Sequence, residues 1–139
     1  MAKVDFYILK QSDPSARTQF SCRLASKVYA LEHKVHVRTE SDQDAEALDQ
    51  LMWTFDDAAF VPHEIWRGGA REAPVTIASA DVPPPSDTEV VINLANSTPA
   101  QGAWRIAEIL DADPETRAAG RQRFAGYRDA GHELDTHKI

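Results

Sequence analysis

Short apolar runs and amphipathic helical stripes alternate along the chain. Residues 4–9 form a largely apolar run with β-branched and aromatic side chains, which is typical of a buried strand. Ser12 or Asp13 then provides a helix N-cap, and Pro14 suits the first helical turn. Apolar residues follow at spacings of four, four and three, which predicts a helix of about five turns. The predicted core stripe of this helix is Phe20, Leu24, Val28 and Leu31.

A second strand and helix follow. Residues 34–37 predict a brief strand, and Ser41 caps a helix whose acidic first turn favours the positive end of the helix dipole. The core face predicted for this helix comprises Ala45, Leu48 and either Leu51 or Met52. The periodicity is lost over residues 53–73, which predicts a long irregular connection.

The second half of the chain continues the alternation. Strands are predicted over 75–78, 89–94 and 105–110, with a proline-rich loop at 82–87. Asp113 and Pro114 open a final helix that we expect to end near Ala130, before Gly131. The pattern predicts one domain, residues 1–139, with three α/β/α layers and a mainly parallel sheet of about five strands.

Composition narrows the class of protein. A chain of 139 residues, 42% hydrophobic and 27% charged, can bury a core without disulfides or metals. The single cysteine, Cys22, excludes an internal disulfide framework, and we expect it to fill space in the core of the first helix. With neither a signal peptide nor a membrane span in the pattern, we expect a cytoplasmic protein.

The charges are unevenly distributed. The net charge is −7, which opposes broad binding to a polyphosphate. Residues 117–128 nevertheless contain four arginines and no acid. This segment indicates either a local anion site or simply a solvated basic helix face.

The chain offers little for catalysis or cofactor binding. Residues 10–14, at the first strand–helix junction, contain no glycine, and Pro14 lacks the N–H group that a phosphate would need. The five histidines show no metal-ligand spacing, and no serine lies in a nucleophile elbow. We therefore expect no enzyme activity, cofactor or metal. The alternative to a non-catalytic protein is a nucleotide-binding or nucleic-acid-processing protein of Rossmann-like fold.

Aromatic and apolar residues crowd the irregular connection. Seven of the fourteen residues in 53–66 are large and apolar, counting Pro62. Most of them should close the core beneath the loop, but their number also suggests a partner surface. The seven are Trp53, Phe55, Phe60, Val61, Pro62, Ile65 and Trp66.

Four segments together resemble a known family. They are LDQLMW at 48–53, FVPH at 60–63, REAPVTI at 71–77 and RQRFAGYRDAG at 121–131. In combination, and with the opening VDFYIL, they are similar to the chi subunit of the bacterial DNA polymerase III clamp-loader complex. The resemblance spans nearly the whole chain. It implies an α/β fold that is similar to nucleotide-binding folds but lacks their activity.

The resemblance also implies a non-catalytic role in DNA replication. Chi subunits bind the acidic C-terminal tail of single-stranded-DNA-binding protein, which ends in Pro-Phe with a free carboxylate. A psi subunit, where present, attaches chi to the clamp loader through a different face, with which helicase-like partners have also been associated. Carried over by position, the tail pocket would comprise Leu110, Arg117, Arg121 and Phe124. The second interface would comprise Trp53 and Phe60, with Pro62 beside them.

Helical spacing supports the tail pocket independently. Arg117, Arg121, Phe124 and Arg128 are separated by four, three and four residues and so share one helix face. Arginine side chains can bind a carboxylate in a bidentate manner, while Leu110 and Phe124 offer an apolar wall for a phenylalanine ring. The alternative is that Phe124 and Tyr127 are simply core residues of an amphipathic helix.

Overall fold

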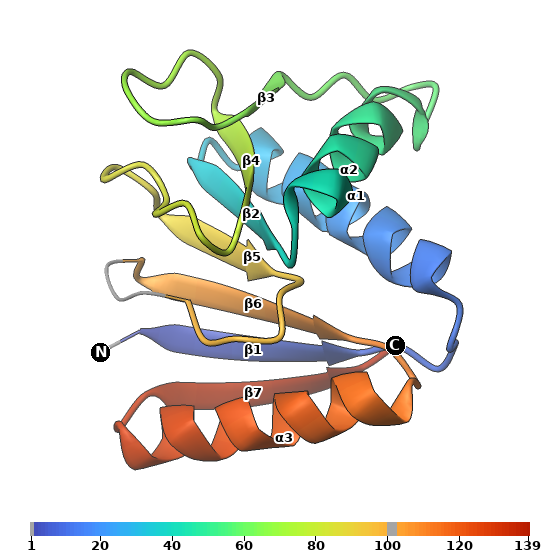
Figure 1. The fold of residues 1–139 in the computed structure, drawn as a ribbon, viewed down its shortest axis with the longest axis vertical. Helices are drawn as coiled ribbons and strands as arrows, with labels where there is room; N and C mark the ends of the chain where they lie inside the picture. Colours follow the sequence, from blue (N-terminus) through green and yellow to red (C-terminus); the bar gives the residue numbers. More distant parts are fainter. Residues whose placement is uncertain (1, 100–102) are drawn as a thin grey trace.

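The computed structural model describes residues 2–99 and 103–139. All seven strands lie in one sheet with the order β3-β4-β2-β5-β6-β1-β7 (Figure 1), and every pairing within the described residues is parallel. Along the chain, the elements are β1 (Lys3–Ile8), α1 (Pro14–Ala30), β2 (Val35–Thr39), α2 (Asp42–Thr54), β3 (His63–Ile65), β4 (Val75–Ser79), β5 (Val90–Asn93), β6 (Arg105–Leu110), α3 (Pro114–Asp129) and β7 (Glu133–Lys138).

The predicted α/β class and parallel sheet are confirmed, but the number of strands was wrong. The structure adds β3 and β7, which form the two edges of the sheet. The connection predicted to be irregular contains β3, which is only three residues long. Strand β7 carries mostly polar side chains because its outer edge faces solvent, and so it shows no apolar run. Neither edge strand has the apolar pattern on which sequence-based prediction depends.

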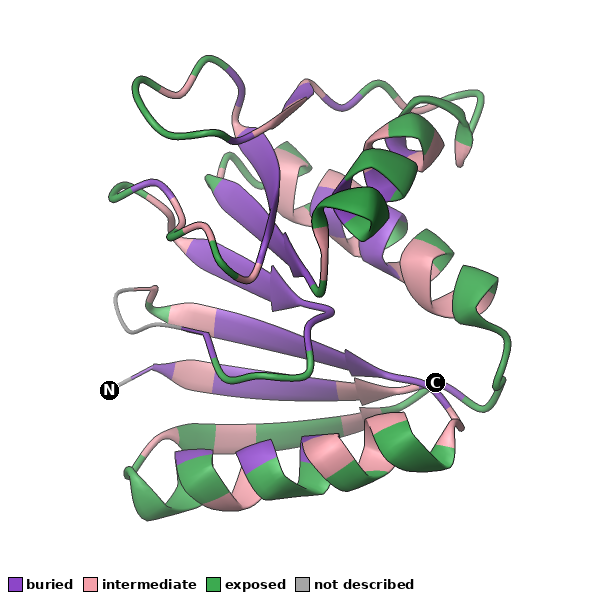
Figure 2. Cartoon of the chain, in the orientation of Figure 1, coloured by how far each residue is buried: buried purple, intermediate pink, exposed green. Residues whose placement is uncertain are grey.

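The three helices lie on the two faces of the sheet, which makes three layers. Helices α1 and α2 cover one face and enclose the larger apolar cluster, while α3 covers β6, β1 and β7 from the other side (Figure 1). Figure 2 shows that most of the central strands are buried and that exposed residues follow the outer faces of the helices; β2, β4 and β5 are buried along their whole length. None of the helices within the described residues is long and apolar enough to cross a membrane.

The predicted N-caps agree with the structure. Asp13, Ser41 and Asp113 each accept a backbone hydrogen bond at the start of a helix, from Ser15, Asp44 and Thr116 respectively. At the other end of α3, Gly131 follows the helix with a φ of 86°, a left-handed conformation that favours glycine. These local signals fixed the three helix starts and the end of α3 to within about one residue. The predicted end of the second helix was wrong, because α2 continues to Thr54, two residues into the connection expected to be irregular.

The core face predicted for α1 is only partly right, because Phe20, Leu24 and Val28 pack against the core cluster but are not its most buried residues, and Leu31 is exposed. The buried residues of α1 are Ser21, Cys22 and Ala25, and Leu31 is 63% exposed. Small side chains allow α1 to approach the sheet closely, which rotates the larger side chains toward the side of the helix. Phe20, Leu24 and Val28 are therefore only partly buried. The expected burial of Cys22 is confirmed, and it raises the pKa of the thiol to about 12.

Candidate protein-interaction sites

The arginine-rich helix α3 presents four of the predicted tail-pocket residues on one lateral face. Arg121 and Arg128 are exposed, Arg117 and Phe124 are half-buried, and the ring of Phe124 lies 5.2 Å from that of Phe6 in β1. Arg121 is exposed and makes no hydrogen bond or ion pair within the described residues. The helix thus brings an uncommitted cation beside a partly exposed aromatic ring.

Leu110, the fifth predicted pocket residue, lies beneath the helix at the end of β6. It is 5% exposed, and α3 crosses it at Gly120. A Cβ atom at position 120 would lie 2.5 Å from Leu110 Cδ1 and 2.9 Å from Cδ2. Only a glycine therefore allows α3 to lie this close to Leu110. Leu110 is therefore buried beneath α3, whereas Arg121 and Arg128 lie on the outer side of the helix.

Arg117 has a structural role that spacing alone did not indicate. Its Nε donates to the carbonyl oxygen of Asp111 at 2.9 Å, and its Nη2 donates to that of Leu9 at 3.3 Å. These bonds tie α3 to the segments that follow β6 and β1 and satisfy carbonyl groups there. Arg117 is therefore anchored, whereas Arg121 has no such partner among the residues that the structure describes.

Arg123, another arginine of this helix, does not belong to the exposed face. It is buried and binds the fully buried Glu108 of β6 through Nε and Nη2, both at 3.0 Å. The hydroxyl of Tyr127 donates to Glu108 Oε2 at 2.7 Å, and Nδ2 of Asn93 donates to both carboxylate oxygens. Burial and the neighbouring Glu108 carboxylate raise the pKa of Tyr127. A signal for this network was present in the sequence, because Glu108 interrupts an otherwise apolar central strand.

The aromatic-rich connection is divided between core and surface. Val61 and Trp66 are buried, as expected for residues that close the core. Trp53 and Phe60 are 54% and 70% exposed, and their ring centroids lie 6.2 Å apart. The two rings form one apolar surface, with the half-buried Pro62 close to Phe60 in sequence.

Trp53 is fixed in place by His63 of β3. The two ring centroids lie 4.5 Å apart, and His63 is almost completely buried beneath the indole. His63 Nδ1 donates to the carbonyl oxygen of Val61 at 2.7 Å, and its Nε2 lies 3.3 Å from the carboxylate of Asp49 in α2. A held aromatic side chain loses little conformational entropy when it binds a partner.

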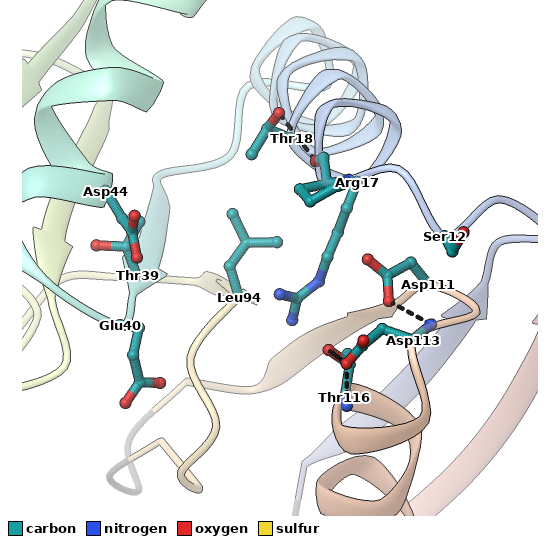
Figure 3. Close-up of a pocket in the computed structure, with 11 residues that line it drawn as sticks. Ser12, Arg17, Thr18, Thr39, Glu40, Asp44, Leu94, Asp111, Asp113 and Thr116 are labelled. Carbon is teal, nitrogen blue, oxygen red and sulfur yellow. Dashed lines mark hydrogen bonds between the residues drawn. The ribbon is translucent and has the colours of Figure 1, made fainter.

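A cleft of about 300 Å³ lies at the carboxyl ends of β2, β5 and β6 (Figure 3). Parallel α/β sheets commonly bind ligands at this edge. Arg17 points into the cleft, and its Nε donates to the carbonyl oxygen of Ile109 at 2.7 Å. Four acidic side chains line the same space, namely Glu40, Asp44, Asp111 and Asp113.

This cleft offers a phosphate group little to bind. The side chains of Asp13 and Asp113 already occupy the helix N-termini, as described above, and the acidic lining repels an anion. The geometry therefore gives no support to the alternative of a nucleotide-binding protein. Within the described residues, no group of three or more histidine, cysteine or acidic side chains could hold a metal ion.

Comparisons with known proteins decide the family. The family described as "DNA polymerase III chi subunit, HolC" matches residues 1–135. The chain belongs to this family. The resemblance found in the sequence is thereby confirmed.

Curated relatives of this chi-family chain match it over nearly its whole length. It is 35% identical to the DNA polymerase III subunit chi of Pseudomonas aeruginosa, with 100% of the chain and 98% of that protein covered. It is 30% identical to the chi subunit of Escherichia coli, with 98% and 97% covered. The chi subunit of Haemophilus influenzae is 26% identical to it.

A solved structure supports the fold alone. The crystal structure of T4 UvsW matches 99% of the chain with a TM-score of 0.67, at 10% sequence identity. The match covers 41% of the UvsW chain. The α/β architecture is thus shared with a protein of unrelated sequence.

Proposed function

We propose that this chi-family chain is a non-catalytic accessory protein of DNA replication that binds the acidic C-terminal tail of single-stranded-DNA-binding protein. The observation that carries the proposal is the lateral face of α3, where the unpaired guanidinium group of Arg121 lies one helical turn from the half-buried ring of Phe124. A tail that ends in phenylalanine presents a carboxylate and an aromatic ring on the same residue, so it matches this pair of groups.

The roles of the pocket residues follow from their contacts. Arg121 binds the terminal carboxylate because it has no internal partner among the described residues. Arg128, whose guanidinium group lies 3.4 Å from Asp129, adds to the local positive charge and attracts the acidic residues upstream. Phe124 and Leu110 contact the inserted ring, and Arg117 positions the start of α3 through its carbonyl contacts.

A titration with a short acidic peptide ending in Pro-Phe tests this role. Removing one member of a charge-assisted pair costs about 1.5–3 kcal/mol, so Arg121→Ala should weaken binding roughly ten- to a hundredfold at low salt. Removing the last phenylalanine of the peptide should have at least as large an effect. The matched control is Arg23→Ala, an exposed arginine of α1, which should bind like the wild type. Equal affinity of wild type and Arg121→Ala would refute the role of α3.

We also propose that Trp53, Phe60 and Pro62 form a second interface that links the protein to the clamp loader, through a psi subunit or a helicase-like partner. The supporting observation is the exposed pair of rings held above His63. Aromatic anchors in such interfaces contribute about 2 kcal/mol or more each. Trp53→Ala should therefore abolish co-purification with the partner while leaving tail-peptide binding unchanged. Co-purification that survives both Trp53→Ala and Phe60→Ala would contradict this assignment.

A further inference from the structure

Both ring nitrogens of His63, the histidine beneath Trp53, face oxygen atoms. The side chain of His63 has 0% of its surface exposed. Its Nδ1 lies 2.7 Å from the carbonyl oxygen of Val61, and its Nε2 lies 3.1 Å from the carbonyl oxygen of Asp49. A carboxylate oxygen of Asp49 lies 3.3 Å from the same Nε2. Among the described residues, the polar neighbours of both ring nitrogens are therefore hydrogen-bond acceptors.

Neither neutral form of His63 satisfies this geometry. A neutral imidazole carries one N–H group and one lone pair. With the proton on Nε2, the lone pair of Nδ1 would face the Val61 oxygen at 2.7 Å, which is a repulsive contact. With the proton on Nδ1, the lone pair of Nε2 would face two oxygen atoms of Asp49. The imidazolium form has two N–H groups and donates on both sides.

The surroundings of the ring favour a positive charge. Burial opposes the charged form, but the Asp49 carboxylate lies within ion-pair distance and its side chain is only 20% exposed. The indole of Trp53 has its centroid 4.5 Å from that of the imidazole, which is within the range at which an aromatic ring attracts a cation. Strand β4 places the uncharged Val75 opposite His63. Among the described residues, Asp49 is the one charged side chain within hydrogen-bonding distance of the ring.

We propose that His63 is an imidazolium in the folded protein and positions Trp53, the anchor of the proposed second interface. The cation joins α2, through Asp49, to the connection, through Val61, and it supports the indole. When the ring loses its second proton as the pH rises, one of its two hydrogen bonds becomes a repulsive contact and Trp53 loses part of its support. The effect on a partner rests on the second interface proposed above, whereas the protonation of His63 is a property of the chain alone.

Nuclear magnetic resonance of the full chain, with ¹⁵N in the histidine rings, counts the protons directly. At pH 7 we expect both ring nitrogens of His63 to carry a proton. His36, which is buried and neutral, supplies the reference for a ring with one proton in the same spectrum. The indole N–H signal of Trp53 should shift as His63 loses its second proton at higher pH, and the signal of the buried Trp66 should not follow it.

Two substitutions in α2 test the role of the carboxylate. Asp49→Asn keeps the shape of the side chain but offers Nε2 an N–H donor, so the second proton of His63 should be lost about one pH unit or more below the wild-type value. The matched control is Glu46→Gln, which removes an exposed carboxylate from the same helix and should leave His63 unchanged.

Three results would overturn the proposal. A single proton on His63 at pH 7, or proton loss at the same pH in Asp49→Asn and the wild type, would refute the buried cation. A Trp53 signal that does not follow the His63 proton would refute the positioning role. All three are measured on the chain without a partner, so they are independent of the co-purification experiment that tests the second interface.

Discussion

Replacing Arg123 by methionine should destabilise the fold severely, although the substitution keeps an unbranched side chain that replaces the apolar stem of the arginine. The change removes two 3.0 Å hydrogen bonds from the carboxylate of Glu108, which is fully buried. It also removes the bond that Arg123 Nη1 donates to the carbonyl oxygen of Asn96 at 3.1 Å. Tyr127 and Asn93 remain as donors, but both are neutral. Glu108 would therefore keep a buried negative charge without a positive partner.

The expected magnitude follows from the burial of both partners. Breaking a buried ion pair by removing one member typically costs 3–5 kcal/mol of unfolding free energy. The total stability of a domain is about 5–15 kcal/mol, so the variant should retain only part of it. For a chain of this size, about 2–4 °C of Tm is lost per kcal/mol, which predicts a fall in Tm of roughly 10 °C.

Urea unfolding followed by far-UV circular dichroism measures this effect. Arg128→Met is the matched control, because it removes an arginine of the same helix whose side chain is 64% exposed. That control should change the unfolding free energy by less than about 0.5 kcal/mol. Adding Glu108→Gln to Arg123→Met should restore part of the stability, since no buried charge then remains. A loss below about 1 kcal/mol in Arg123→Met, or no difference from Arg128→Met, would refute the reasoning.

Two further predictions concern buried positions. Burial lowers the pKa of His36 to about 4, and its Nε2 has no partner within the described residues. His36 is therefore neutral in the fold but protonates near pH 6.5 when unfolded. Because the folded state resists this protonation, the unfolded state binds the proton first as the pH falls below 6.5. The free energy of unfolding should therefore fall by roughly 2–3 kcal/mol between pH 7 and about pH 4.5. His36→Gln should show a flatter pH profile in denaturant titrations, and parallel profiles would contradict this. Gly120→Ala should destabilise the protein by about 1–2 kcal/mol because its Cβ meets Leu110. Gly126→Ala has no atom within 4 Å of the added Cβ and should instead be neutral or stabilising by up to about 1 kcal/mol. If the two alanine variants have the same Tm, the contact between an added Cβ atom at position 120 and Leu110 does not affect stability, and the prediction is refuted.

Local chemistry in the sequence determined the central part of the fold. Asp13, Ser41 and Asp113 fixed the helix starts, because capping depends on side chains only a few residues from the backbone groups that they satisfy. The apolar runs located the five inner strands, since strands of a parallel sheet are buried on both faces and are rich in apolar residues. The buried polar residues within them, such as His36, Arg38 and Glu108, did not follow from that pattern. The alternation of strands and helices then led to a parallel sheet.

The face on which each helical residue lies was decided by tertiary structure. The spacing identified an apolar stripe of which Phe20, Leu24 and Val28 do pack against the core. The most buried residues of the helix, however, are the small ones: Ser21, Cys22 and Ala25. Small side chains on a helix allow it to pack closely on a sheet, and close packing is favourable. The periodicity of apolar residues does not reveal how close the helix and the sheet will be. The same limit applies to Gly120, whose role depends on Leu110 in a different element.

Arg121 and Arg123 show the difference most clearly. In the sequence they are two arginines of one basic helix, two residues apart. In the structure Arg121 is exposed on the surface, while Arg123 pairs with Glu108 in the interior. The sequence by itself determined that this helix is basic and that it follows the last inner strand. Only the packing of α3 on β6 decided which guanidinium group is available to a partner, because a buried carboxylate binds whichever arginine faces it.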